Sequence, residues 1–223
     1  MRLIELPRHD CLLVIEHSQE QSCQIMKLKR AIAAMVLVSA FAAPVAAGSF
    51  EDAVDANARG DYTKALRLIR PLANDGDAAA QFNLGLMYIT GHGVQQDDAA
   101  AAFWFRKAAD QGDAVAEFLL GNQYANGKGV PQDYSEAMIW FQRAAEQGHP
   151  LAKFYLGVMY AEGRGVPQDY VRAYMWFSLS AAQGDQRAVK TLEMAERRMT
   201  PAQINEAQKL ARDWKPATKP TPH

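Results

Sequence analysis

Cysteine is scarce in this sequence of 223 residues, which contains only Cys11 and Cys23. Both lie within the first 25 residues, and none follows. A disulfide framework between later residues is therefore excluded, because no thiol is present there to form one. The remainder of the chain must be held together by its hydrophobic core.

A long apolar run is also missing. The longest, residues 31–45, has about 15 residues, whereas a membrane-spanning helix needs about 18 or more. It follows the basic segment Met26–Arg30 and ends in Val45-Ala46-Ala47, with small residues where a signal peptidase cleaves. We predict a signal peptide over residues 26–47, cleaved after Ala47, and hence a periplasmic or secreted protein with no membrane span; a membrane anchor is the alternative.

Because a signal peptide starting at Met26 is complete by itself, residues 1–25 are interpreted as an over-extended gene start. No cysteine follows the apolar run, which argues against a lipoprotein anchor. N-terminal sequencing of the native protein would test both the cleavage position and the gene start.

Charge of one sign is lacking as well, with 24 basic and 25 acidic residues. This balance gives no electrostatic reason to expect nucleic acid or an anionic membrane surface as a partner. Ser-x-x-Lys, Gly-x-Ser-x-Gly and His-Glu-x-x-His motifs are absent. His92, His149 and His223 are too scattered to predict a metal site. We expect a protein without enzymatic activity, cofactor or metal.

What the sequence does contain is a repeat. The segment Gly85–Val94 recurs as Gly121–Val130 and again as Gly157–Val166, each time 36 residues later. A fixed period in this range is typical of a solenoid, in which each unit packs only on its neighbours. The predicted units are residues 77–112, 113–148 and 149–184.

Two helices are predicted in each unit. In the first unit, Ala80, Leu84 and Tyr88 share one face of the first helix. Gly85 lies inside that helix at a cost of about 1 kcal/mol relative to alanine, so its recurrence indicates close approach of the second helix. On the second helix, Trp104 and its copies Trp140 and Trp176 fall on a broad apolar stripe. We interpret the tryptophans as core residues; a sugar-stacking platform is the alternative.

The loop between the helices carries paired glycines. In the first unit Gly91 stands where a left-handed residue ends a helix, Gly93 allows a second unusual turn, and Val94 can return to the helix pair. Asp97 is positioned to cap the second helix. The same pattern recurs in the other units at Gly127, Gly129, Val130 and Asp133, and at Gly163, Gly165, Val166 and Asp169.

The ends of the repeat array differ from its middle. Residues 48–76 are predicted to be an atypical first repeat, with helices over 50–59 and 62–74. The buried face of the second of these is expected to consist of Ala65, Leu68, Leu72 and Ala73. Residues 185–214 are predicted to be capping helices, the last beginning at Thr200-Pro201. Residues 215–223, with three prolines, are predicted to be a disordered tail.

The order Ala-x-x-x-Leu-Gly-x-x-Tyr-x-x-Gly-x-Gly-Val-x-x-Asp-x-x-x-Ala-x-x-Trp-Phe-x-x-Ala-Ala-x-Gln-Gly occupies residues 80–112 and 116–148. It recurs over 152–184 with Ser180 in place of one alanine. It resembles the Sel1-like repeat (SLR), a relative of the tetratricopeptide repeat, over about half of the chain. The resemblance implies an all-α, right-handed solenoid of helical hairpins and an adaptor or scaffold role, often in assembling complexes, including envelope processes. It supplies no catalytic residue.

These features lead to an expected non-catalytic scaffold of the cell envelope that binds a protein or peptide on the concave face of the solenoid. The alternative is a protein that binds envelope polysaccharide or peptidoglycan. A third reading is a hydrolase of penicillin-like compounds, as proposed for some disulfide-rich members of the family; the absence of cysteine after residue 25 separates this chain from them.

Two surfaces are candidates for binding. The first is a groove on the first helices, where aromatic anchors would suit a peptide or helix; its phenylalanines could instead pack between units. The second is a basic row in the loops, between the paired glycines, for which an unconstrained solvent position is the alternative. The groove residues are Phe82, Leu86, Phe118, Asn122, Phe154 and Val158. The basic row consists of His92, Lys128 and Arg164.

Overall fold

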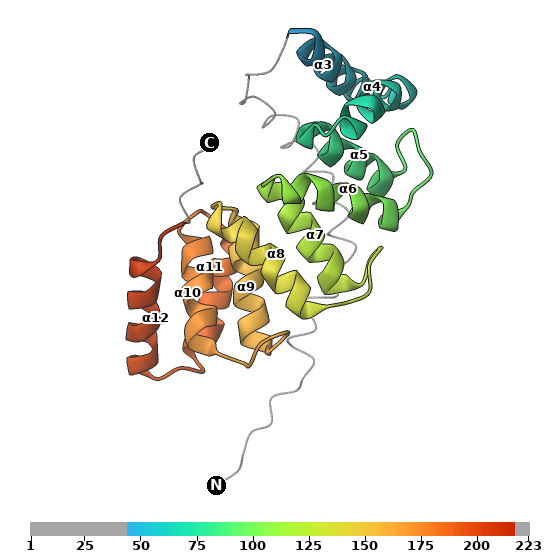
Figure 1. Ribbon diagram of the computed structural model, residues 1–223. Coiled ribbons are helices and arrows are strands. Elements are labelled where there is room, and N and C mark those ends of the chain that lie inside the picture. Colours follow the sequence, from blue (N-terminus) through green and yellow to red (C-terminus); the bar gives the residue numbers. More distant parts are fainter. Residues whose placement is uncertain (1–43, 217–223) are drawn as a thin grey trace. The chain divides into compact units, whose positions relative to one another are not determined.

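The computed structural model describes residues 44–216, which form helices joined by short loops, with no strand in that part of the chain (Figure 1). The predicted over-extended start, most of the predicted signal peptide and the end of the predicted tail lie outside these residues. The helices are α3 Pro44–Ala58, α4 Tyr62–Asn74, α5 Ala78–Thr90, α6 Asp98–Asp110, α7 Ala114–Asn126, α8 Tyr134–Glu146, α9 Pro150–Glu162, α10 Tyr170–Ala181, α11 Gln186–Glu196 and α12 Pro201–Asp213.

The helices are stacked in chain order. Helix α5 packs on α6, α7 on α8 and α9 on α10, and the second helix of each pair also packs on the first helix of the next. Each unit therefore contacts chiefly its neighbours, which is the contact pattern of a helical solenoid. Every helix in the described part of the chain falls short of the length and apolar character needed to cross a membrane.

The glycine inside each first helix makes this pairing close. A Cβ atom on Gly85 would lie 2.6 Å from the ring of Phe105, and one on Gly121 would lie 2.8 Å from the ring of Phe141. Phe105 is 1% exposed, and its ring occupies the space that a side chain on Gly85 would need. Burial of such a ring contributes about 1.5–3 kcal/mol, which offsets the cost of the glycine. The predicted close approach is confirmed.

Helix ends follow the predicted signals. Gly91 ends α5 in the left-handed region with φ 70°, and Gly93 follows with φ 72°. The carboxylate of Asp97 accepts hydrogen bonds from the backbone N–H groups of Ala99 and Ala100 at the start of α6. Thr200 and Gln203 form a capping box at the start of α12. Because these contacts are local, the sequence was sufficient to predict the glycine turns, the Asp97 cap and the helix start at Thr200; the part played by Gln203 was not predicted.

The first two helices depart in part from expectation. Helix α3 begins at Pro44 rather than Phe50, so it extends across the predicted cleavage position. Helix α4 has the predicted bounds, but its buried residues are Ala65, Ile69 and Ala73. The expected core residues Leu68 and Leu72 are only half-buried. The error arose because the contact stripe follows a spacing of four residues, which Ile69 satisfies between the two alanines.

The last two helices both pack on α10 (Figure 1). Helix α11 begins and ends within the predicted segment, and α12 lies beside α10. Tyr174 of α10, Ala195 of α11 and Ala207 of α12 share one buried cluster. On α10, Met175 is 9% exposed, whereas its copies Phe103 and Ile139 are 54% and 52% exposed.

Candidate binding site

The phenylalanines of the predicted groove are buried. Phe82, Phe118 and Phe154 are 9%, 5% and 5% exposed. The ring of Phe118 lies 5.8 Å from that of Phe141 in its own unit and 5.7 Å from that of Tyr155 in the next. These rings thus pack within and between units and are not exposed anchors, so the alternative interpretation holds for them. The other groove residues, Leu86, Asn122 and Val158, are half-buried.

The loop residues of the predicted basic row do not form three equivalent solvent positions. The ring of His92 stacks on that of Tyr62 with centroids 4.0 Å apart. Arg164 lies 5.4 Å from the Tyr134 ring centroid and pairs with Glu162 at 2.6 Å. Lys128 is exposed. His92 and Arg164 each contact an aromatic ring in the preceding unit. They are therefore neither members of a uniform basic row nor unconstrained solvent positions.

The glycines that follow His92 and Arg164 explain why these side chains reach the preceding unit. A Cβ on Gly93 would lie 2.6 Å from the carbonyl oxygen of Tyr62, and one on Gly165 would lie 2.8 Å from the carbonyl carbon of Tyr134. The loop therefore rests on the first residue of the preceding unit's second helix. The 36-residue spacing revealed the glycines but could not show which backbone they approach.

The tryptophans of the repeats serve the core. Trp140 and Trp176 are 4% and 7% exposed, and Trp104 is half-buried. The guanidinium carbons of Arg106 and Arg143 lie 5.1 and 4.6 Å from the Trp140 ring centroid. Two guanidinium groups therefore lie over the Trp140 ring. Because the ring is also buried, Trp140 offers no exposed face on which a sugar could stack.

A row of buried polar side chains occurs at one position of the first helices, which sequence reasoning missed. Gln81, Glu117 and Lys153 are 3%, 1% and 3% exposed. Gln111 donates from Nε2 to Oε1 of Gln81 over 2.8 Å. Burial raises the pKa of the Glu117 carboxyl, although hydrogen bonding from Gln147 and the charge of Arg143 oppose that shift. The equal 36-residue spacing of the three residues was the available signal.

The third member of this row is different. Burial lowers the pKa of the Lys153 ammonium. Its Nζ lies 4.8 Å from the ring centroid of Trp214, which directly follows α12. Trp214 in turn contacts Trp176, with centroids 5.7 Å apart. The end of α12 is thereby held over the third repeat by an ammonium–aromatic contact.

His149 caps α9 in place of the aspartate found in the earlier units. Its Nδ1 accepts a hydrogen bond from the backbone N–H of Ala152 over 3.3 Å, and its ring stacks on Phe118 with centroids 4.6 Å apart. Burial, together with the charge of Lys153, lowers the pKa of His149 to about 4. The imidazole is therefore neutral near pH 7, as its acceptor role requires.

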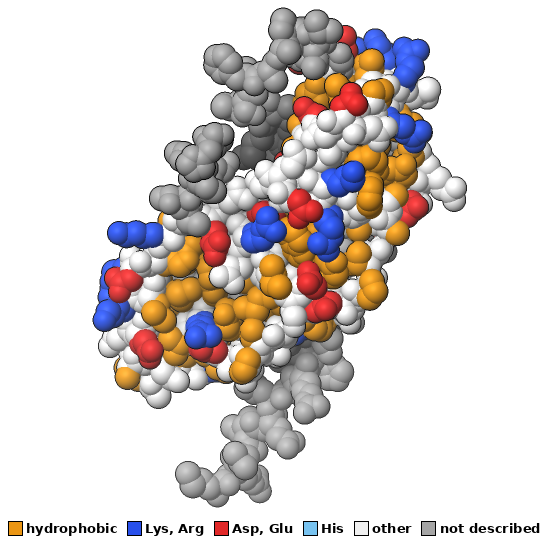
Figure 2. All heavy atoms as spheres, viewed as in Figure 1, with side chains coloured by type: hydrophobic (Ala, Val, Ile, Leu, Met, Phe, Trp, Pro, Cys, Tyr) orange, Lys and Arg blue, Asp and Glu red, His pale blue; other side chains and the backbone are white. Residues whose placement is uncertain are grey.

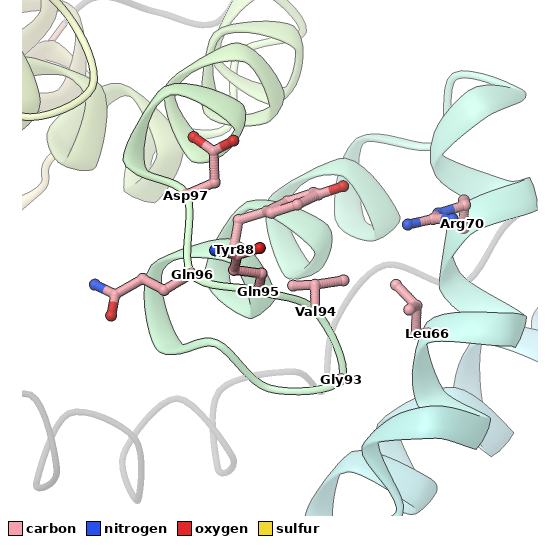
Figure 3. A pocket seen from close by; sticks show the side chains of 8 residues that line it. All are labelled: Leu66, Arg70, Tyr88, Gly93, Val94, Gln95, Gln96 and Asp97. Carbon is pink, nitrogen blue, oxygen red and sulfur yellow. The ribbon is translucent and has the colours of Figure 1, made fainter.

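A pocket of about 520 Å³ opens at the junction between α4 and the first glycine loop (Figure 3). Its walls combine apolar, amide and charged side chains. In Figure 3, the Arg70 guanidinium from α4 and the Tyr88 hydroxyl from α5 are directed toward one another across the pocket. The lining residues are Leu66, Arg70, Tyr88, Gly93, Val94, Gln95, Gln96 and Asp97.

The surface around the stack is mixed in character. On the face visible in Figure 2, apolar patches are interspersed with both basic and acidic side chains. Within residues 44–216, no three His, Cys, Asp or Glu side chains gather in a way that could hold a metal ion.

The Sel1 repeat family model matches residues 78–113, 114–149 and 150–185. A protective antigen present in uropathogenic Escherichia coli strains, which displays an SLR fold, is similar with a TM-score of 0.61 and 36% identity over 66% of this chain and 32% of its own. A Sel1 repeat protein from Oxalobacter formigenes has a TM-score of 0.61 and 32% identity, covering 65% of this chain and 60% of its own. No curated protein matches the chain.

The chain thus spans about a third of the first of these structures and less than two thirds of the second. The repeat region of this chain, residues 78–185, therefore belongs to the Sel1 repeat family.

Proposed function

We propose that the protein is a non-catalytic scaffold of the cell envelope that holds a segment of another protein against its stacked helices. Sel1 repeats generally have a role in protein–protein interaction, and the expected signal peptide over residues 26–47 would deliver the chain to the envelope.

The observation that carries it is the pocket beside Arg70 and Tyr88. Its volume falls within the range of ligand pockets, about 300–1,000 Å³, and its several polar groups beside Leu66 and Val94 suit part of a peptide. The half-buried residues Leu86, Asn122 and Val158 occupy one register position in three successive first helices. In the proposed complex, these residues contact the same segment as it continues past the pocket.

A photo-crosslinking experiment tests this function. A benzophenone amino acid is placed at Gln95, which lines the pocket, or at Asn122, and as a control at the exposed residue Lys190 on α11. Irradiation of the envelope fraction followed by mass spectrometry should identify one protein that is crosslinked from Gln95 or Asn122 and not from Lys190.

Absence of any such position-specific protein would contradict the proposed scaffold. Retention on peptidoglycan or an envelope polysaccharide, with no crosslinked protein, would instead favour the polysaccharide-binding alternative. The same preparations show whether the mature chain begins at Gly48, as the predicted cleavage requires.

A further inference from the structure

The pocket lies where the first repeat departs from the other two. Residues 95 and 98 are Gln and Asp, whereas the later loops have Pro131 and Pro167, then Tyr134 and Tyr170. In the second loop, Gln132 donates to the carbonyl of Ala125 over 2.9 Å and to the Tyr134 hydroxyl over 3.1 Å. Gln168 repeats both bonds in the third loop.

Gln96 is the corresponding glutamine of the first loop. Because Asp98 replaces the tyrosine, the phenol acceptor used by Gln132 is missing there. Among the described residues, Gln96 makes neither of the two side-chain hydrogen bonds made by its copies. The first loop thus keeps free amide groups beside the pocket, while the equivalent amides later in the chain are used internally.

The arginine of the pocket differs from its copy in the same sense. Arg106, 36 residues after Arg70, donates to the hydroxyl of Tyr124 and lies 5.1 Å from the Trp140 ring centroid. Tyr124 and Trp140 are the copies of Tyr88 and Trp104. At the first junction, Lys107 lies 5.5 Å from the Trp104 ring centroid, as its copy Arg143 lies 4.6 Å from that of Trp140, but among the described residues no contact of Arg70 corresponds to those of Arg106.

Arg70 is therefore left available. It is exposed, and within residues 44–216 it takes part in no ion pair, side-chain hydrogen bond or ring contact. At the second junction the arginine and the tyrosine, Arg106 and Tyr124, are hydrogen-bonded to each other. At the first junction Arg70 and Tyr88 are not. Local departures from a repeated pattern that have no structural gain are the places where binding function is expected.

We infer that Arg70 and Tyr88 bind a carboxylate of an acidic peptide segment, an inference that rests on the proposed scaffold function. A guanidinium presents paired donors that match the two oxygens of a carboxylate, and a phenol can add a third donor. Leu66 and Val94 offer an apolar wall for a neighbouring side chain. Gln95 and Gln96 can bond to the backbone of the segment.

Asp97 also lines the pocket and narrows the ligand class. Oδ1 of its carboxylate accepts hydrogen bonds from the backbone N–H groups of Ala99 and Ala100, and the carboxylate is directed away from Arg70 in Figure 3. A second negative charge so near favours a ligand with one negative charge over a dianion such as phosphate. The segment bound is thus one with a glutamate or aspartate beside apolar residues, or a chain end.

Two probe peptides separate the two sources of the carboxylate. Ac-Gly-Leu-Glu-Leu-Gly-NH₂ carries it only on a side chain, and Ac-Gly-Leu-Gln-Leu-Gly-OH carries it only at the C-terminus. Ac-Gly-Leu-Gln-Leu-Gly-NH₂ carries none and is the control. Titrations of the full protein are followed by NMR shifts of the backbone amides of Tyr88 and Gln95.

One of the two acidic peptides should bind at least about tenfold more tightly than the neutral peptide. Arg70→Gln should abolish that difference, Tyr88→Phe should reduce it, and Arg67→Gln on the exposed side of the same helix should leave it unchanged. Added salt should weaken the acidic peptide selectively.

Equal binding of all three peptides, or no loss in Arg70→Gln, would overturn the inference. The scaffold itself is tested separately by the crosslinks. A crosslinked partner that persists in Arg70→Gln would leave the scaffold standing while removing the carboxylate site.

Discussion

Gln147 donates from its side-chain amide to Oε2 of Glu117 over 2.8 Å, joining the end of one second helix to the first helix of the same unit. The equivalent bond in the preceding unit joins Gln111 to Gln81. A carboxylate and an amide thus fill the same buried position. The negative charge that the carboxylate adds is balanced by Arg143, whose Nε lies 3.1 Å from Oε1 of Glu117.

Replacing Glu117 by Gln should change the free energy of unfolding by less than about 1 kcal/mol at pH 7. Burial raises the pKa of Glu117, so the ionised form is disfavoured in the folded state despite its partners. The variant removes that cost and keeps an acceptor for Gln147. Urea unfolding provides the measurement.

Arg143→Met is the matched control for Glu117→Gln. It leaves a buried carboxylate without its cation and should cost about 2 kcal/mol or more. If Glu117→Gln proved the more damaging of the two, the ion pair would contribute more than its burial costs, contrary to the raised pKa.

Acidification should destabilise the protein through His149. Its pKa is lowered to about 4 in the folded state from about 6.5 when unfolded. The unfolded chain therefore binds the proton more readily between these values, and stability present above pH 6.5 is lost as the pH falls toward 4. The loss should reach about 3 kcal/mol.

The control is His149→Asn, which keeps an N-cap acceptor but cannot titrate. Urea unfolding at pH 7, 5.5 and 4 should show a smaller pH dependence in this variant than in the wild type. Identical pH dependence in both proteins would show that His149 is not responsible.

Trp140→Ala should reduce the free energy of unfolding by about 3–5 kcal/mol, because the ring is 4% exposed and its loss leaves a cavity. Ile139→Ala, one residue earlier, removes a side chain that is 52% exposed and should cost less than about 1 kcal/mol. Thermal unfolding of the two variants gives the comparison. A Trp140→Ala protein that melts like the wild type would show that the indole is not part of the core.

Gly85→Ala should destabilise the protein by about 1–3 kcal/mol, because the added Cβ meets the Phe105 ring at 2.6 Å. The clash is with a side chain, so Phe105→Leu should relieve it in part. The double variant should therefore be more stable than the two separate losses predict, which a double-mutant cycle measures. Strict additivity would indicate that Gly85 is required for another reason.

Local signals in the sequence were sufficient for the helix pairs, the left-handed glycines and the aspartate caps, because each depends on residues close together in the chain. Gly85 even indicated the proximity of another helix. The partners of His92 and Arg164 could not be predicted, since their rings belong to the preceding unit and nothing in the spacing identifies them. The same limit applies to the phenylalanines of the proposed groove, whose burial depends on neighbours contributed by the next unit.

The residues of the candidate pocket could likewise not be recognised from the sequence alone. Gln95 and Asp98 are visible in the sequence as departures from the repeat, but their effect is seen only when Gln132 and Gln168 are found bonded to tyrosines. Arg70 lies outside the three full units, so the repeated motif gave no reason to consider it. Comparing each residue with its copies 36 positions away was the signal that could have found it.

Gly93 and Gly165 contact the backbone at the start of the preceding unit's second helix, and this contact has an evolutionary consequence. The joint uses main-chain atoms and a missing side chain, so it does not depend on which residues the adjoining unit displays to solvent. Duplication of one complete period would recreate the same joint at both new boundaries. Such a chain can lengthen by gene duplication and then diversify its exposed positions, while a partial duplication would leave a loop with no helix to receive it.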